Sequence, residues 1–578
     1  MAIIYTKNNP YTAPMTFQLK EENFAALAVP YVVSGNIVDV IGKRVFKGRI
    51  YVNVFGYIEK IEEADVSEDV YIMPGFVDSH VHIESSMLMP SEFARAAVAR
   101  GVVAAICDPH EIANVLGVDG IEYFIANGKA SGFKFFFGAP SCVPAASHET
   151  SGAKLGSAEI EYLMHKEDIW FLGEMMNFPS VVQKDHEVIA KIAIAQKSKK
   201  PIDGHAPGLS GRNLEKYVEA GISTDHECMD VCEAEEKITL GMKILIREGS
   251  AAKNFDALYP LINQYPSSVM LCSDDSHPDD LKNGYIDKLV SRSLEKNLDF
   301  FNVIRAATYN PVTHYKVPVG LLREGDSADF IITDFLEPNF NILKTYISGK
   351  IVYDRVGETI NLKRPTLEIK NNFKASKISS KSIQIENQNQ SSKIKIIKVV
   401  DKELYTKQLA EFPVVENGML VSSVSDDILK IVVVNRYVSN AKSVIGFING
   451  FGLKKGAICS TIAHDSHNII AVGVDDESIV KCVNSVIEVS GGISVFDGTS
   501  INLLKLPIAG IISDKGIDEV AEQYKNLNNK VKNDLGSILT SPLMTLSFMA
   551  LTVIPELKIG DKGLFDAVKF EQTQLFVD

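Results

Sequence analysis

An alternation of apolar runs and amphipathic segments sets the strongest limit on the fold of this chain. Between Gly75 and Asp275, eight strand-like runs end in small or polar residues, and segments with helical spacing and charged flanks separate them. The runs are "GFVDSHVH", "GVVAAICDP", "FKFFFGAP", "IWFLGEMM", "PIDGHAPG", "GISTDHE", "KILIREGS" and "SVMLCSDD".

Strands that alternate with helices predict βα units and a parallel sheet. Eight such units in a stretch of this length favour an α/β fold with a (β/α)₈ TIM-like barrel, whose usual size is about 250 residues. An open, doubly wound sheet is the alternative, but no glycine-rich phosphate turn follows the first run.

The segments outside the barrel carry different patterns. Short strand patterns broken by glycines occupy residues 29–72 and 318–370, and we expect them to form one composite β-sandwich beside a barrel of residues 73–317. Residues 371–393 are rich in Ser, Lys, Asn and Gln, which is typical of a flexible linker. Residues 394–578 combine alternating strand patterns with a late helix and predict a separate α+β domain. Residues 1–28 form an N-terminal extension without an assigned structure.

The composition excludes several classes of partner. The chain of 578 residues has a formal net charge of −14, which argues against a nucleic acid partner. No apolar stretch approaches the roughly 20 residues that span a bilayer, and the first residues do not resemble a signal peptide. The seven cysteines are scattered and odd in number, as reduced cytosolic thiols would be. We therefore expect a cytoplasmic multidomain protein without membrane contact, and a homodimer as the default oligomer.

Histidines and carboxylates stand at the ends of five of the predicted barrel strands. His80 and His82 close the first run, and the alternation of a strand places both on one face. Because the C-terminal ends of barrel strands meet at one mouth, six such side chains should converge there. They exceed the needs of one four-coordinate ion and suit two divalent ions bridged by Glu174 and a hydroxide. The predicted metal ligands are His80, His82, Glu174, His205, His226 and Asp274.

Other interpretations of the histidines and other catalytic motifs are less well supported. A lone histidine at a strand end is usually structural, and we expect that role for His148, His165 and His186. The sequence contains no helical zinc-protease pair, no G-x-S-x-G elbow and no G-x-x-x-x-G-K-[ST] loop. The "HIE" at His82 matches half of the zinc cytidine-type deaminase signature, but no P-C-x-x-C accompanies it, which excludes that fold.

Taken together, these residues resemble the amidohydrolase superfamily and, within it, the family of bacterial adenine deaminases. The matching stretches are "PGFVDSHVHIESSM", "CDPHEIANVLG", "GEMMNFPSVV", "DGHAPGLSG", "TDHE", "CSDDSHP", "GFGLKKGAICSTIAHDSHNIIAVG" and "LPIAGIISD". The resemblance covers nearly the whole chain after its first 25 residues. It implies that Glu174 bridges the metals where many relatives use a carboxylated lysine, and that residues 394–578 form an adenine deaminase-type C-terminal domain.

The resemblance also implies a reaction, namely hydrolytic deamination of adenine to hypoxanthine and ammonia on a binuclear metal centre, as in purine salvage. We expect Asp274 to act as a general acid–base beside the attacking water. Glu84, just past the two histidines, could hydrogen-bond to the purine ring or protonate it. Asp108, His110 and Glu111 follow the second run, and we expect at least one of them to orient the substrate or relay a proton. Capping of the next helix is their structural alternative.

Several alternatives stay open at this point. The metals are expected to be Mn²⁺ or Fe²⁺, with Zn²⁺ as a further candidate, since histidine–carboxylate sites accept all three. Another amidohydrolase reaction, on a cyclic amidine or amide such as guanine or a dihydropyrimidine, is the second function. A non-catalytic scaffold barrel is the third, although such relatives usually lose metal ligands and none of the six is missing here.

Two histidines, His464 and His467, lie in the C-terminal segment with Asp465 between them. They could form a second metal or regulatory site, or a polar turn that bonds to its own backbone. We favour a third interpretation, in which the C-terminal domain packs near the barrel mouth and shields the site from water.

Overall fold

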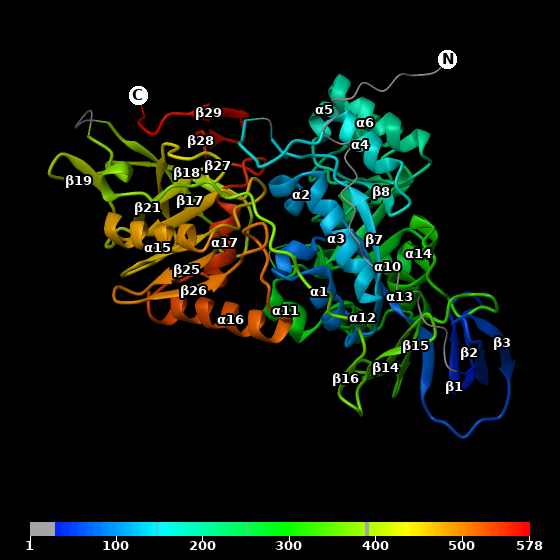
Figure 1. Cartoon of the computed structure of the whole chain (residues 1–578). Helices are drawn as coiled ribbons and strands as arrows, with labels where there is room; N and C mark the ends of the chain where they lie inside the picture. The colour runs from blue at the N-terminus through cyan, green and yellow to red at the C-terminus, as the bar shows by residue number, and fades with distance from the viewer. Residues whose placement is uncertain (1–28, 147, 251, 388–391, 578) are drawn as a thin grey trace, which may run out of the picture.

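The computed structural model describes residues 29–146, 148–250, 252–387 and 392–577. The predicted N-terminal extension, residues 1–28, lies outside these ranges. The chain forms a small β-rich part, a central barrel and a C-terminal domain (Figure 1). Within the described ranges, every helix is too short or too polar to cross a membrane.

Eight parallel strands form the barrel, which confirms the predicted fold class. Five strands pair in the order β5-β6-β7-β8-β9 and three in the order β10-β11-β12. Asp274, after β12, closes the ring, since its backbone N–H donates to His80 O at 2.9 Å and its carbonyl accepts from His82 N at 3.3 Å. On the other side, Ser223 N donates to Ile202 O at 2.9 Å. The strands are β5 (Phe76–Val81), β6 (Val102–Cys107), β7 (Lys134–Ala139), β8 (Ile169–Met175), β9 (Ile202–Gly204), β10 (Thr224–Asp225), β11 (Lys243–Arg247) and β12 (Val269–Cys272).

The barrel strands are apolar because helices cover their outer side and other strands face them inside. Every residue of β6 and of β12 is buried, as expected for parallel strands covered on both faces. Aspartates start several of the helices, for example Asp185 and Asp230, whose side chains accept the first free N–H groups. The helices are α1 (Pro90–Val98), α2 (His110–Leu116), α3 (Val118–Ser131), α4 (Ser157–Met164), α5 (Phe178–Gln183), α6 (His186–Lys197), α7 (Gly211–Glu219), α8 (Val231–Thr239), α9 (Phe255–Leu258), α10 (Leu261–Gln264), α11 (Pro278–Asn283), α12 (Ile286–Glu295), α13 (Phe300–Ala307) and α14 (Tyr309–Tyr315).

Segments from both sides of the barrel join in one sheet. Its eight strands run in the order β16-β15-β14-β13-β4-β1-β2-β3, so β4 and β13 bring the two segments together. The sheet encloses its own small core, in which the rings of Phe330 and Tyr346 stack at 4.3 Å. The strands are β1 (Tyr31–Asp39), β2 (Arg44–Val52), β3 (Ile58–Glu63), β4 (Tyr71–Pro74), β13 (Phe330–Thr333), β14 (Ile342–Ile347), β15 (Lys350–Asp354) and β16 (Thr359–Ile360).

A second eight-stranded sheet, in the order β18-β17-β22-β21-β24-β23-β25-β26, forms the centre of the C-terminal domain. Neighbouring residues such as Ile458 and Cys459 of β23 belong to different hydrophobic clusters, because each face of the sheet packs on its own helices. The strands are β17 (Ile394–Val399), β18 (Thr406–Glu411), β21 (Ile428–Val434), β22 (Val444–Asn449), β23 (Ala457–Ser460), β24 (Ile469–Gly473), β25 (Gly492–Phe496) and β26 (Ile501–Lys505). The helices are α15 (Asp476–Glu488), α16 (Ile517–Asn533) and α17 (Pro542–Phe548), and the remaining strands are β19 (Val414–Glu416), β20 (Met419–Val421), β27 (Leu557–Gly560), β28 (Gly563–Asp566) and β29 (Glu571–Thr573).

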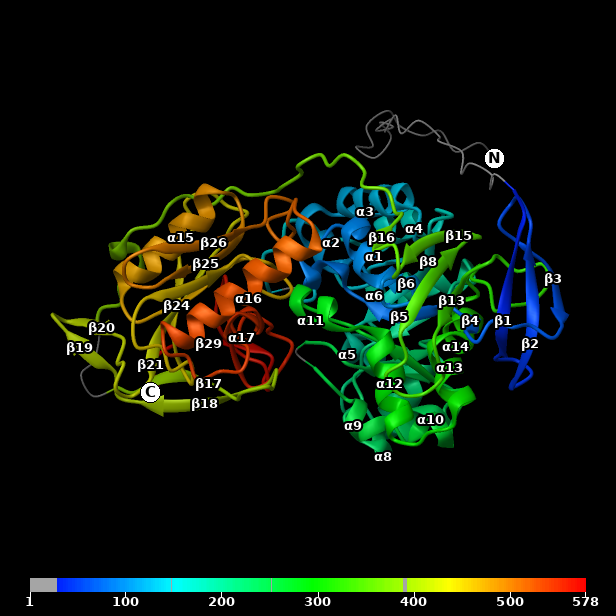
Figure 2. The same cartoon turned by 90° about the horizontal axis from the view of Figure 1, so that it is seen from below.

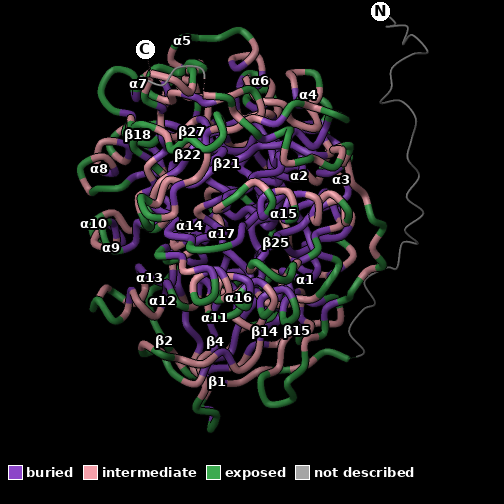
Figure 3. Tube along the Cα trace, turned by 90° about the vertical axis from the view of Figure 1, so that its left-hand side faces the viewer, coloured by how far each residue is buried: buried purple, intermediate pink, exposed green. Residues whose placement is uncertain are grey.

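The C-terminal domain packs against the barrel through a shared core. One hydrophobic cluster includes Val520 of α16 and barrel residues such as Leu281 of α11, and Figures 1 and 2 both show these helices side by side. At the same contact the ring of Tyr524 stacks on His277 at 5.0 Å. Buried segments fill the centre of the molecule, while exposed segments lie at its rim (Figure 3). The domain boundaries suggested by the sequence stay predictions.

Residues 371–387 differ from the flexible linker that their composition predicts. Ile383, in the short 3₁₀ helix η2 (Ser380–Ile383), is fully buried against the C-terminal sheet. The Ile378 N–H donates to Asn484 Oδ1 at 2.8 Å, and Asn371 Nδ2 donates to Ser490 O at 2.6 Å. This stretch is therefore a packed connection and not a free tether.

Candidate active site

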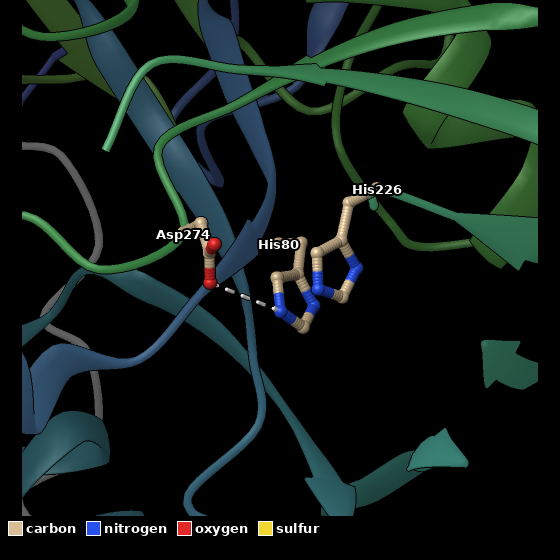
Figure 4. A group of neighbouring side chains, drawn as sticks. All are labelled: His80, His226 and Asp274. Carbon is tan, nitrogen blue, oxygen red and sulfur yellow. Dashed lines mark ion pairs between the residues drawn. The ribbon is translucent and has the colours of Figure 1, made fainter. Parts of the chain in front are cut away.

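The six residues predicted as metal ligands meet in one buried cluster at the C-terminal ends of the barrel strands. They follow or end β5, β8, β9, β10 and β12, which all open toward the same mouth. The rings of His80 and His226 stack at 4.3 Å, and Asp274 faces His80 from the closing strand (Figure 4). Groups of three within this cluster hold their ligand atoms within 4.8 Å of one another, as a bound cation requires.

The histidines of the first strand have the geometry of metal ligands. Their Nε2 atoms lie 3.1 Å apart, and His82 Nδ1 lies 2.9 Å from the carbonyl oxygen of Asp108. Since a carbonyl only accepts, Nδ1 of His82 carries a hydrogen, which leaves Nε2 as the ring nitrogen that would bind a cation. A backbone acceptor behind a ligating imidazole is a frequent feature of metal sites.

Glu174 lies between histidines that come from different barrel strands. Its Oε1 lies 3.1 Å from His82 Nε2, while its Oε2 lies 2.7 Å from His205 Nδ1 and 3.3 Å from His226 Nε2. The two oxygens therefore face different histidines. Burial opposes the charge of Glu174, but the neighbouring imidazoles, His205 first, hold its pKa well below the usual range.

Asp274 is held in a fixed and unusual conformation. Its φ of 55° lies in the left-handed region, which a non-glycine residue rarely adopts. Its Oδ1 lies 3.3 Å from His82 Nε2, and its other oxygen accepts a hydrogen bond from Arg247. Burial opposes its charge, but Arg247 and the nearby imidazoles hold the pKa of Asp274 well below the usual range.

Arg247 and Glu227 belong to the site, although the sequence analysis missed both. Arg247 ends β11 and donates to both carboxylate oxygens of Glu227, at 2.6 Å and 2.8 Å. Glu227 in turn lies 3.3 Å from His226 Nε2. The position of Arg247 at the end of "KILIR" is the signal that could have identified it.

Glu84 lies in the 3₁₀ helix η1 (Ile83–Ser86) and is fully buried. The N–H of Ile112 donates to its Oε1 at 3.0 Å. Burial, together with the charge of Glu111, raises the pKa of Glu84 to about 8. A carboxyl that keeps its proton near neutral pH can donate it to a heterocycle.

Asp108 and His110 lie next to Glu174. Asp108 Oδ2 accepts from the N–H of Glu174 at 2.8 Å, and its Oδ1 has no hydrogen-bond partner. His110 Nδ1 lies 3.5 Å from Glu174 Oε1 and is also unpartnered. Burial and the charge of His82 lower the pKa of His110 to about 4, so this ring is neutral.

Glu111 faces the C-terminal domain. His464 Nδ1 lies 2.9 Å from its Oε1, and His467 Nε2 lies 3.8 Å from its Oε2. The ring of His464 stacks on Phe548 at 4.5 Å. The loop that carries these histidines therefore reaches the barrel mouth, in agreement with the third interpretation of the sequence.

The histidines that we expected to be structural lie outside the metal-ligand cluster. His148 packs on Phe565 of the C-terminal domain, with ring centroids 3.9 Å apart. His165 Nδ1 lies 2.6 Å from Glu161 O within its own helix end, and His186 starts α6.

Comparisons with known proteins agree with this geometry. Residues 71–352 match the amidohydrolase family, and residues 403–571 match the adenine deaminase C-terminal domain. The adenine deaminase of Methanosarcina mazei is 54% identical over 94% of this chain and 99% of its own length. That of Borreliella burgdorferi is 48% identical over 93% of this chain and 98% of its own length. Among solved structures, an enamidase of the amidohydrolase superfamily is 18% identical, with a TM-score of 0.44 over 58% of this chain and 99% of the enamidase.

Proposed function

The chain belongs to the adenine deaminase family of amidohydrolases, and from this membership we propose that it hydrolyses adenine to hypoxanthine and ammonia at the barrel mouth. The observation that best supports this reaction is the Glu174 carboxylate, whose two oxygens face separate histidines. That arrangement matches a bridged pair of cations.

The amidohydrolase family is metal-dependent, and the described residues include candidate ligands. We propose two divalent ions, Mn²⁺ or Fe²⁺ with Zn²⁺ as the alternative. When bound, such ions lower the pKa of water from 15.7 towards about 7, so that hydroxide is available at neutral pH. Their ligands would be His80, His82, Glu174, His205, His226 and Asp274.

Two carboxyl groups of the chain can move the protons of the reaction. The oxygen of water becomes the C6 carbonyl of hypoxanthine, and its two hydrogens end on N1 and on the departing ammonia. Asp274, held as a carboxylate by Arg247, would take a proton from water and pass it to the amino group. Glu84 would donate its proton to N1 and be reprotonated by the second proton that the attacking water releases.

Asp108, His110 and Glu111 would act around the substrate. Asp108 positions Glu174 through its N–H, and His110 presents a neutral ring beside the same carboxylate. Glu111, paired with His464, fixes the C-terminal loop over the mouth. That cover would exclude bulk water and so strengthen the electrostatic effects in the site.

Turnover of a panel of bases, measured by product analysis as well as by ammonia release, tests the proposal. Full-length protein purified without chelators and supplied with Mn²⁺ should release ammonia from adenine and leave guanine and dihydropyrimidines untouched. Turnover of guanine or a dihydropyrimidine in place of adenine would favour the second function, and no turnover of any base by metal-loaded protein would favour a scaffold. The homodimer and the cytoplasmic location also stay predictions.

A further inference from the structure

Unpartnered polar atoms gather on both sides of the contact between the barrel mouth and the C-terminal loop. On the barrel side they are Asp108 Oδ1 and His110 Nδ1. On the loop side they are Asp465 Oδ2 and both ring nitrogens of His467. All four residues are buried. Because buried polar atoms without hydrogen-bond partners are costly and rare, we look for a ligand that would satisfy those at this contact.

The loop of residues 461–468, between β23 and β24, is held firmly against the barrel. The N–H of His464 donates to Ser547 O at 3.1 Å, and the hydroxyl of Tyr437 donates to Ser466 O at 2.6 Å. Asn468 Nδ2 donates to Thr150 O, across the domain contact, at 3.0 Å. A loop with this many fixed bonds can present a side chain to a ligand in one geometry.

Asp465 is the carboxyl that this loop brings to the site. One of its oxygens lies 3.8 Å from His464 Nδ1, and the other has no partner. Burial raises the pKa of Asp465 to about 7; the charge of His464 opposes this rise, and the charges of Glu111 and Glu174 add to it. In either protonation state, a free carboxyl oxygen can accept a hydrogen bond.

The chemistry of the substrate limits what Asp465 can bind. Adenine has two kinds of N–H donor, the amino group on C6 and the single N–H of its five-membered ring. The amino group is the leaving group and must lie beside Asp274 and the metal ligands. The ring N–H is therefore the donor left for a carboxyl on the loop that covers the mouth.

We propose that Asp465 accepts a hydrogen bond from the five-membered-ring N–H of the purine, so that a residue of the C-terminal domain selects the free base over N9-substituted purines. This role rests on the proposed function, because it assumes a purine in the site. A nucleoside lacks the N–H and would leave the buried Asp465 oxygen unsatisfied. Such a loss strongly disfavours the analogue that cannot make the bond.

Equilibrium binding of unreactive ligands tests this role without relying on turnover. Calorimetry on the metal-loaded full chain should show purine binding at least about tenfold more tightly than 9-methylpurine, the scale of one hydrogen bond to a carboxylate. Asp465→Leu, of similar volume but without an acceptor, should weaken purine binding by about tenfold and bring the two affinities close together. Asp465→Asn keeps an acceptor oxygen and should retain most of the preference.

Asp534→Asn is the matched control, since Asp534 is exposed at the end of α16 and pairs with Lys530 of that helix. It should bind both ligands as the unaltered chain does. Equal affinity of the unaltered chain for purine and 9-methylpurine would overturn the role of Asp465. An unchanged preference in a folded Asp465→Leu chain with normal metal content would do the same. Failure of the unaltered chain to release ammonia from adenine would instead refute the proposed function, while the ligand preference would still decide the role of Asp465.

Discussion

His464 Nδ1 lies 2.9 Å from Glu111 Oε1, so an imidazole of the C-terminal domain pairs with a carboxylate at the start of α2 in the barrel. Both side chains are almost completely buried. A buried pair of this kind is costly to break, because removal of one partner leaves the other charge without compensation. The C-terminal domain is therefore bound to the barrel at a residue of the candidate active site.

The first prediction concerns this pair and activity. His464→Ala leaves the Glu111 carboxylate unpaired and loosens the loop over the mouth. We expect kcat/KM for adenine to fall by about tenfold or more, the scale of a lost charged hydrogen bond. Steady-state assays of ammonia release measure this. Activity equal to that of the unaltered chain would show that the pair has no role in the reaction.

The same pair predicts a pH dependence of stability. Burial opposes the charge of His464, but Glu111 raises its pKa to about 9, above the value of about 6.5 expected when unfolded. The stabilisation from His464 is therefore fully present below about pH 6.5 and is lost as the pH rises through about 9. We therefore expect the Tm of the unaltered chain to exceed that of the His464→Gln, Glu111→Gln double variant, and the difference in Tm to be larger at pH 6 than at pH 10. A constant difference between the two would contradict the assignment.

A further prediction concerns proton transfer by Asp274. Asp274→Asn should lower kcat by about 10² or more, the contribution of a general base, and leave much of the metal in place. Asp256→Asn serves as a control, because that side chain is 77% exposed and pairs with Arg292 instead of with a predicted metal ligand. Turnover within a few-fold of the unaltered chain would move the role to Asp275 or Glu84.

Glu84 should act as the acid that protonates the purine ring. Glu84→Gln keeps the volume and an acceptor for the Ile112 N–H but has no acidic proton. We expect kcat for adenine to fall by about 10² with little change in KM. If kcat is unchanged, the ring nitrogen receives its proton from another group.

The closed mouth predicts a preference for the base over the nucleoside. The C-terminal loop leaves the site residues buried, with Glu84 and Glu111 at 1% and 2% exposed. Adenosine carries a ribose in place of the ring N–H, so we expect its turnover to be at least about 10²-fold slower than that of adenine, as when a buried group is left unpaired. Equal or faster turnover of adenosine would refute this prediction.

Much of this site could be predicted from local patterns in the sequence. The eight apolar runs mark the barrel strands because parallel strands are covered on both faces, and histidines that interrupt such runs at their ends need partners or metals. His80, Glu174 and Asp274 were found in this way. Arg247 ends a run too, but its side chain is a cation and does not bind metal ions, so the pattern of metal ligands does not indicate it.

Packing of the C-terminal domain near the mouth was predicted, but the residues that make the contact could not be. His464 and Glu111 lie in different domains, and nothing in the pattern around either residue indicates the other. The polar composition of residues 371–393 also concealed Ile383, a single apolar side chain that binds this stretch to the C-terminal sheet. Packing of this kind depends on tertiary contacts and not on local composition.

The central proposal is that Glu174 bridges two divalent ions. Metal content, measured together with adenine turnover, tests this role most directly. The unaltered chain, purified without chelators, should hold two divalent ions. Glu174→Gln keeps the volume but loses the bridging charge, so it should hold one ion and lose turnover. Glu219→Gln, at an exposed position of α7, should behave as the unaltered chain does. If Glu174→Gln holds two ions and keeps full turnover, Glu174 does not bridge the ions.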